Sequence, residues 1–167
     1  MPKSTCNEAF NKGAEQRAEF PLPHGAYKLT ETRDRLKSCK AEIDRIRNYV
    51  SGKADKWSLE HCTYYDKHKW LKNLPEWVAF CLGRDLLPGL LACEGEIDGA
   101  DLITIQNIYP ALESSCHKLI DNFESTRQQI NKSIKVEYLA MKSGGSLLEP
   151  LIDDAIGLVD KALSVLP

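Results

Sequence analysis

The sequence lacks the short motifs by which many enzyme classes are recognised. It has no glycine-rich phosphate loop, because Arg47 stands five residues before Gly52, where that loop requires another glycine. It also has no CxxC, HExxH, GxSxG or EF-hand pattern, and no pair of ExxH motifs such as those that bind iron in helical bundles. We therefore predict no catalytic residues, no metal ligands and no cofactor.

Long apolar runs are also absent, and glycine and proline are scarce. No segment approaches the roughly 20 apolar residues that span a bilayer, and the first residues, MPKSTCNEAF, contain no apolar signal-peptide region. The 167 residues include only 10 glycines and 8 prolines, with 43% hydrophobic and 28% charged residues, which is typical of a globular protein. These features predict one cytoplasmic domain with a core of its own.

Six cysteines raise the question of disulfides. They are never closer than twelve positions, whereas small disulfide scaffolds crowd their cysteines into loop-rich chains. Cys39 and Cys116 fall on apolar faces of expected helices, where a free cysteine behaves as a small hydrophobic residue. We predict that the cysteines are reduced, structural thiols.

Apolar residues recur at helical spacing through most of the chain, and no alternating strand pattern is present. Clear examples are residues 29–50, residues 58–72, residues 111–142 and residues 146–165. We predict an all-α fold, an antiparallel bundle of about four to six helices over residues 27–167. Residues 1–26 are expected to form a partly irregular N-terminal arm, with a short helix over residues 7–17 allowed by the pattern.

Prolines and polar residues suggest where helices begin and bend. Asn73-Leu74-Pro75-Glu76 resembles the start of a new helix, whose apolar residues 77–82 are expected to lie centrally. Asp98 is expected to cap another helix, with Asp101 in its first turn, and Pro110 should kink or split that helix. Ser146 and Glu149, three residues apart, predict a capping box.

Polar, aromatic and basic residues are concentrated in the expected helix over residues 58–72. His61 and His68 share one helical face but lie about 10.5 Å apart along the axis, too far to bind one metal ion easily. Neighbouring residues on a helix diverge by about 100°, so at least one of two adjacent tyrosines should be partly exposed. Exposed aromatic residues beside lysines are typical of protein-binding hot spots. The predicted partner-binding residues are Tyr64, Tyr65, Lys67, His68, Lys69 and Trp70.

Charge is unevenly distributed, although the net charge is only −2. Residues 33–72 contain eleven basic and six acidic residues, whereas residues 73–124 contain two basic and nine acidic residues. This split can steer a charged partner or favour self-association into a homo-oligomer. The basic stretch also allows a nucleic-acid regulator, against which the acidic net charge argues.

The leading hypothesis is a non-enzymatic helical protein–protein interaction module, such as an inhibitor, an immunity protein, an adaptor or an assembly subunit. Two alternatives are a small helical enzyme or nuclease-like toxin, and a nucleic-acid-associated regulator that uses Arg33 to Lys72. A pocket in which His, Asp and Cys converge would favour the enzyme. Binding that weakens steeply with salt would favour the regulator.

Overall fold

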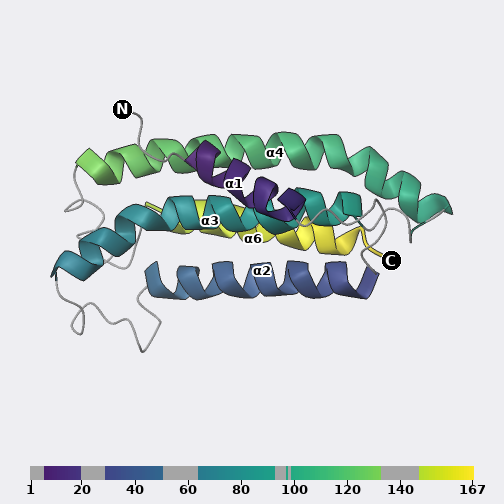
Figure 1. Cartoon of the computed structure of the whole chain (residues 1–167), viewed down its shortest axis with the longest axis horizontal. Coiled ribbons are helices and arrows are strands. Elements are labelled where there is room, and N and C mark those ends of the chain that lie inside the picture. Colours follow the sequence, from purple (N-terminus) through teal and green to yellow (C-terminus); the bar gives the residue numbers. More distant parts are fainter. Residues whose placement is uncertain (1–5, 20–28, 51–63, 93–96, 98, 133–146) are drawn as a thin grey trace.

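The computed structural model consists of helices, as the sequence predicts. It describes residues 6–19, 29–50, 64–92, 97, 99–132 and 147–167, except the side chains of residues 16–19, 29–31, 49–50, 64–72 and 92. The described residues contain five helices and no strand (Figure 1). The helices are α1 (Cys6–Glu19), α2 (Leu29–Val50), α3 (Tyr64–Ala92), α4 (Gly99–Lys132) and α6 (Glu149–Ser164).

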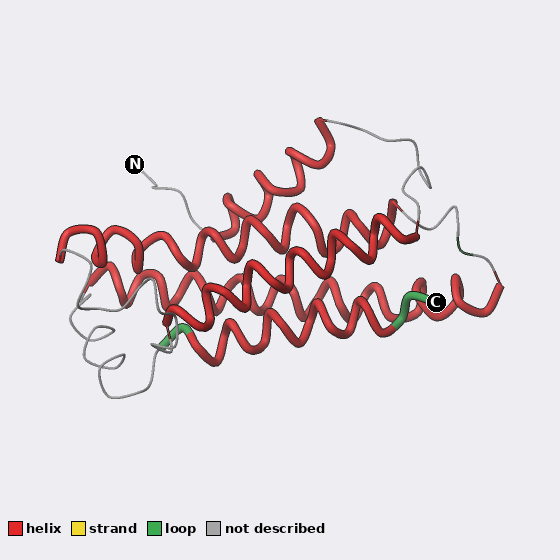
Figure 2. The backbone as a smooth tube through the Cα atoms, turned by 90° about the horizontal axis from the view of Figure 1, so that it is seen from below, coloured by secondary structure: helices red, strands yellow, loops and turns green. Residues whose placement is uncertain are grey.

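The four longer helices lie alongside one another and form an antiparallel bundle. In Figure 1, α2 and α4 run from right to left, whereas α3 and α6 run from left to right. Figure 2, the view from below, shows the same elongated arrangement of nearly parallel axes. In Figure 1, α1 lies in front of the bundle and α6 lies behind α3. None of the described helices has the length and apolar content of a bilayer-spanning segment.

The helices α2, α4 and α6 each bury one apolar face, which confirms the faces predicted for them. Side chains at steps of three and four residues on these helices are fully or almost fully buried. On α4 the last buried apolar residue of this pattern in the described part is Ile130. The predicted extension of the pattern to Lys142 lies outside the described residues. The buried residues include Leu36, Cys39, Ile43, Ile46, Leu112, Cys116, Ile120, Phe123, Ile152, Ala155, Val159 and Ala162.

The predicted new helix start at Asn73 is wrong. A single helix, α3, continues from Tyr64 to Ala92 with Pro75 and Pro88 in its interior. A proline in a helix interior removes one hydrogen bond and costs about 3 kcal/mol. Residues on both sides of Pro75 are buried, among them Leu74 and Val78, so tertiary packing outweighs that cost. Pro110 likewise lies inside α4, which bends in its N-terminal part in Figure 1.

The expected capping box at the start of α6 is not formed as predicted. The N-cap position is held by Leu148, which makes no side-chain capping bond, and Glu149 is the first helical residue. Pro150 stands in the first turn, where its missing N–H leaves no helical bond unmade. On α4, Asp101 lies in the first turn as expected, and Asp98 lies outside the described residues.

The short helix expected within residues 7–17 is confirmed as part of α1, which packs closely on α3. A Cβ atom at Gly83 would lie 2.0 Å from the backbone oxygen of Phe10, and one at Gly13 would lie 2.3 Å from that of Phe80. The two glycines therefore permit a backbone-to-backbone contact that a side chain would prevent. Cys6 and Phe10 of α1 are also buried.

The start of α1 is held by α4. The backbone N–H of Cys6 donates to Glu124 Oε2 at 2.8 Å, which places a carboxylate at the positive end of α1. The same carboxylate accepts from Arg127, which is nearly buried and also lies 3.7 Å from Glu76 of α3. Glu124 and Arg127 thereby join α1, α3 and α4.

Candidate functional site

The predicted partner-binding residues lie in the first two turns of α3. Tyr64, Tyr65, Lys67, His68, Lys69 and Trp70 all belong to this helix. Their side chains lie outside the described residues, so their exposure and contacts remain predictions. The helix continues from Trp70 to Trp77 in seven residues, which is two helical turns.

The most exposed aromatic side chain described on α3 is Trp77. It is 46% exposed, and its ring stacks on that of Phe80 with the centroids 5.8 Å apart and the planes inclined by 21°. The guanidinium carbon of Arg84 lies 5.6 Å from the centroid of the Phe80 ring, within the range of a cation–π interaction. Steps of three and four residues align Trp77, Phe80 and Arg84 on one face of α3. We call these three residues the aromatic ridge.

The indole of Trp77 is held in place by α2. Its Nε1 donates to Glu42 Oε1 at 3.2 Å, and Arg45 Nη2 donates to the same oxygen at 2.5 Å. The hydrogen bond from Arg45 lowers the pKa of Glu42, burial opposes this effect, and the bond from Trp77 adds to it. Glu42 is therefore ionised at neutral pH and fixes the ring at the surface.

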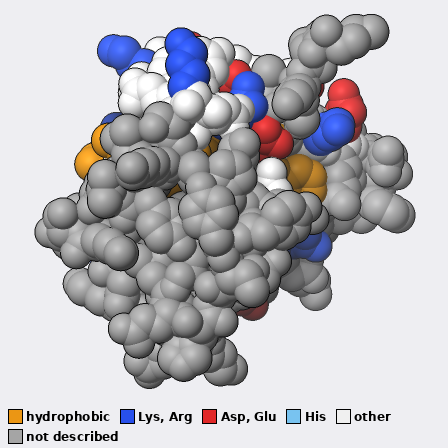
Figure 3. All heavy atoms as spheres, turned by 90° about the vertical axis from the view of Figure 1, so that its left-hand side faces the viewer, with side chains coloured by type: hydrophobic (Ala, Val, Ile, Leu, Met, Phe, Trp, Pro, Cys, Tyr) orange, Lys and Arg blue, Asp and Glu red, His pale blue; other side chains and the backbone are white. Residues whose placement is uncertain are grey.

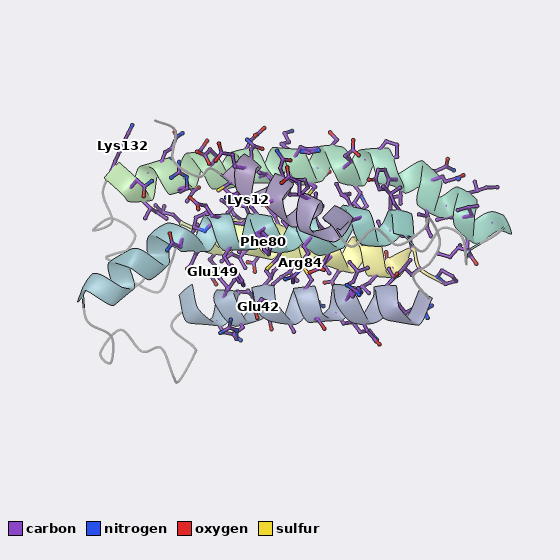
Figure 4. All side chains as sticks on the ribbon, viewed as in Figure 1. Lys12, Glu42, Phe80, Arg84, Lys132 and Glu149 are labelled. Carbon is purple, nitrogen blue, oxygen red and sulfur yellow. The ribbon has the colours of Figure 1, made fainter. Side chains whose placement is uncertain are left out.

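The other end of the ridge is fixed by Asp85. Arg84 donates from Nε and Nη2 to Asp85 Oδ2 at 3.0 and 2.8 Å, and the Asp85 side chain is almost completely buried. This hydrogen bonding raises the pKa of Arg84, and burial opposes the rise. Figure 4 shows Phe80 and Arg84 between Glu42 of α2 and Lys12 of α1.

Two hollows flank Trp77. The hollow between α2 and α3 has a volume of about 290 Å³, and the one between α1 and α3 has a volume of about 250 Å³. Trp77 lines both, and so does Asn73. The first hollow also contacts Arg45, Ile46 and Leu74, and the second contacts Ala9, Lys12, Glu76 and Phe80. An indole held between two hollows can insert between two side chains of a partner, and each of those side chains can then occupy one of the hollows.

The charges around the ridge are mixed. The ridge itself contains Arg84, and Lys12 and Arg45 lie beside it, together with the carboxylates of Glu42 and Asp85. At the end of the bundle seen in Figure 3, basic and acidic side chains of the described residues also lie side by side. Such a surface differs from the stripe of a single positive sign that nucleic-acid binding requires.

The expectation that residues 77–82 lie centrally is correct for four of them and wrong for Trp77 and Phe80. Phe80 is half-buried and Trp77 is exposed, whereas the other four are buried, namely Val78, Ala79, Cys81 and Leu82. Helical spacing places Trp77 and Phe80 on the same side of α3 as the polar residues Asn73 and Arg84, and this relation holds whether the helix begins at Tyr64 or at Asn73. The large apolar rings favoured an inward position, whereas the polar neighbours on the same side were the signal of exposure.

The described thiols are structural. Cys6, Cys39, Cys81 and Cys116 are buried and unpaired, and Cys39 Sγ donates to the backbone oxygen of Cys81 at 3.7 Å. Burial raises the pKa of Cys81 to about 11 and that of Cys116 to about 12, so both are protonated and poor nucleophiles at neutral pH. The described residues contain no group of three or more His, Cys, Asp or Glu residues placed to hold a metal ion.

No protein-family model, curated protein or solved structure matches this chain, so its function has to be inferred from its own residues and their geometry.

Proposed function

We propose that this chain is a non-enzymatic helical protein–protein interaction module that binds its partner through the aromatic ridge of α3. An inhibitor, an immunity protein, an adaptor or an assembly subunit has this kind of activity. The observation that carries the proposal is the exposed Trp77, fixed by Glu42 and set between two hollows. Tryptophan and arginine are the residues most enriched among interface hot spots.

The surroundings of the ridge indicate which partner surface fits. The hollows beside Trp77 contact apolar atoms of Ile46, Leu74 and Phe80, and they suit aliphatic or aromatic side chains. Lys12 and Arg45 line their rims and suit carboxylates. A partner with apolar side chains surrounded by acidic residues satisfies both requirements.

A cytoplasmic location is part of the same proposal, and the four unpaired core thiols support it. The enzyme alternative requires a pocket in which His, Asp and Cys converge. Neither hollow beside Trp77 has such a lining. The regulator alternative requires a continuous basic surface, and the mixed charges around the ridge favour a protein partner instead.

Trp77→Ala tests the proposal. Trp77 is half exposed, so its truncation should leave the fold intact, yet it should weaken partner binding about 30-fold or more. The tagged chain is used to capture partners from its native cells, and the dissociation constant is then measured with the purified partner. Ile103→Ala is the matched control, because Ile103 is 57% exposed and belongs to α4, which carries no residue of the ridge. A partner that binds Trp77→Ala as tightly as the wild type would exclude the ridge as its site.

The same measurements locate the limits of the surface. Single alanine substitutions at Tyr64, Tyr65, His68 and Trp70 are sorted first by melting temperature and then by partner affinity. Truncation of a core tyrosine should lower the free energy of unfolding by roughly 3 kcal/mol, whereas truncation of an exposed anchor should lower only the affinity for the partner. If all four substitutions lower the melting temperature sharply, the interface does not extend into this part of α3. Lys67 and Lys69 are tested by replacement with glutamate.

A further inference from the structure

A groove of about 380 Å³ separates α4 from α6. In Figure 1, α6 lies behind α3 whereas α1 lies in front, so this groove is distinct from the surface around the aromatic ridge. Its lining includes Lys118 and Leu119 on α4, and Asp154, Gly157, Leu158 and Lys161 on α6.

Among the described residues, Gly157 meets no condition that requires glycine. Its φ does not lie in the left-handed region, and a Cβ atom placed on it would meet no described atom beyond its own helical turns within 4 Å. Glycine weakens a helix interior relative to alanine. At Gly13 and Gly83 of the same molecule, glycine permits a second helix backbone to make contact. An open glycine on the outer side of α6 therefore fits the close approach of a helix from outside the chain.

Opposite charges flank the Gly157–Leu158 pair symmetrically. Asp154 and Lys161 stand equally far from the midpoint between Gly157 and Leu158, about 5 Å along the helix on either side. Both side chains are exposed, and neither makes an ion pair with another residue in the described part of the chain. When two copies of α6 cross antiparallel over this midpoint, each Asp154 faces the Lys161 of the other copy.

We propose that the chain forms a two-fold symmetric homodimer, in which α6 of each copy packs antiparallel on the other across Gly157. A two-fold interface must be self-complementary, and the order Asp154, Gly157, Lys161 has this property. Leu158, half-buried in the groove wall, supplies apolar contact at the centre. The dimer leaves both aromatic ridges accessible, so dimerisation and partner binding at Trp77 are independent.

Charge reversal tests this arrangement with the full-length chain. Sedimentation velocity over a series of concentrations should show a dimer for the wild type. Asp154→Lys and Lys161→Asp each place two like-charged pairs across the interface, and each should raise the dimer dissociation constant about tenfold or more. An equal mixture of the two variants restores both opposite pairs and should form a heterodimer. Lys132→Asp, at the exposed end of α4, is the control and should dimerise as the wild type does (Figure 4).

Gly157→Ala separates packing from charge. Its added methyl group meets open space within one chain, so the variant should fold and melt at a temperature no lower than that of the wild-type monomer. The same methyl group should hinder the helix crossing and raise the dimer dissociation constant. A wild type that is monomeric at all concentrations, single charge variants that dimerise normally, or a mixture that fails to associate would each overturn the proposal.

Discussion

Single atoms decide whether α1 can pack on the bundle. The space that Gly83 leaves empty is filled by the backbone of Phe10, and the space at Gly13 is filled by that of Phe80. Backbone atoms cannot move aside as the end of a long side chain does. These two positions therefore have a steric requirement that composition alone does not express.

Gly83→Ala should destabilise the chain by about 1–3 kcal/mol, because the new methyl group has to push α1 away from α3. Thermal melting followed by circular dichroism measures the loss. Gly89→Ala is the matched control on the same helix, since among the described residues its methyl group would meet only the Thr32 side chain, at an ordinary 3.9 Å. That control should be neutral or stabilising by up to about 1 kcal/mol. Equal effects at both positions would contradict the close crossing.

The buried thiols should make the stability of the chain depend on alkaline pH. Burial raises the pKa of Cys81 to about 11, above the value of about 8.5 for an exposed thiol. Above about pH 8.5 the unfolded chain has lost this proton while the folded chain retains it, so stability falls as the pH rises. The free energy of unfolding should therefore decrease between about pH 8.5 and about 11. Cys81→Ala should show a smaller decrease over the same range.

Thiol counting tests the redox state of the same residues. Titration with a thiol reagent under denaturing, non-reducing conditions should detect close to all six cysteines. A count of zero or two in freshly purified protein would place the chain in an oxidising compartment instead.

At the scale of elements, α4 contributes one buried face and one exposed face over its whole length. Ile120 is completely buried and Ile103 is 57% exposed, although both are isoleucines on the same helix. The bend at Pro110 lies between them. Identical substitutions at the two positions therefore measure burial on one helix, with the chemistry held constant.

Ile120→Asp should unfold the chain or cost several kcal/mol, because it buries a carboxylate without a partner. Ile103→Asp should leave the melting temperature nearly unchanged, since its carboxylate stays in water. Chemical denaturation provides both free energies of unfolding. Unchanged stability of Ile120→Asp would mean that this face of α4 does not lie in the core.

At the scale of the whole molecule, charged residues join the separate helices. Lys40 and Arg47 of α2 pair with Asp160 and Asp153 of α6, each with a nitrogen–oxygen distance of 2.6 Å. These pairs are exposed and each contributes at most about 1 kcal/mol. The pairing of Arg127 with Glu124 and Glu76 is more buried and should contribute more to stability.

Arg127→Ala should cost about 3 kcal/mol, because it removes the nearly buried cation that Glu124 and Glu76 share. Lowering the pH should weaken the same contact, because it protonates Glu124. Burial raises the pKa of Glu124, but the hydrogen bonds from Arg127 and from the Cys6 N–H outweigh it and hold the pKa below its ordinary value. This stabilisation is present above the ordinary glutamate pKa of about 4.3 and is lost as the pH falls. Melting temperatures from pH 7 down to pH 3 should fall less steeply for Glu124→Gln than for the wild type.

The helical periods alone determine the all-α bundle and the buried faces of α2, α4 and α6. These faces follow from local spacing, since residues three and four apart share a side wherever the helix lies. The exposure of Trp77 did not follow in the same way, because apolar residues lie on most sides of α3 and their spacing does not single out an exposed face. The continuity of α3 through Pro75 did not follow either. Local rules favour a break there, and only the burial of residues on both sides offsets the lost hydrogen bond.

The tertiary structure alone decided which distant residues meet. Gly83 touches the backbone of Phe10, and Glu124 holds the start of α1 across 118 positions of sequence. Glu42 reaches Trp77 from another helix. Neither the helical spacing nor any sequence motif predicts these contacts, because they depend on how whole helices pack against one another. The sequence therefore determined which residues of α2, α4 and α6 face inward, and helix packing determined which surface residues form a site.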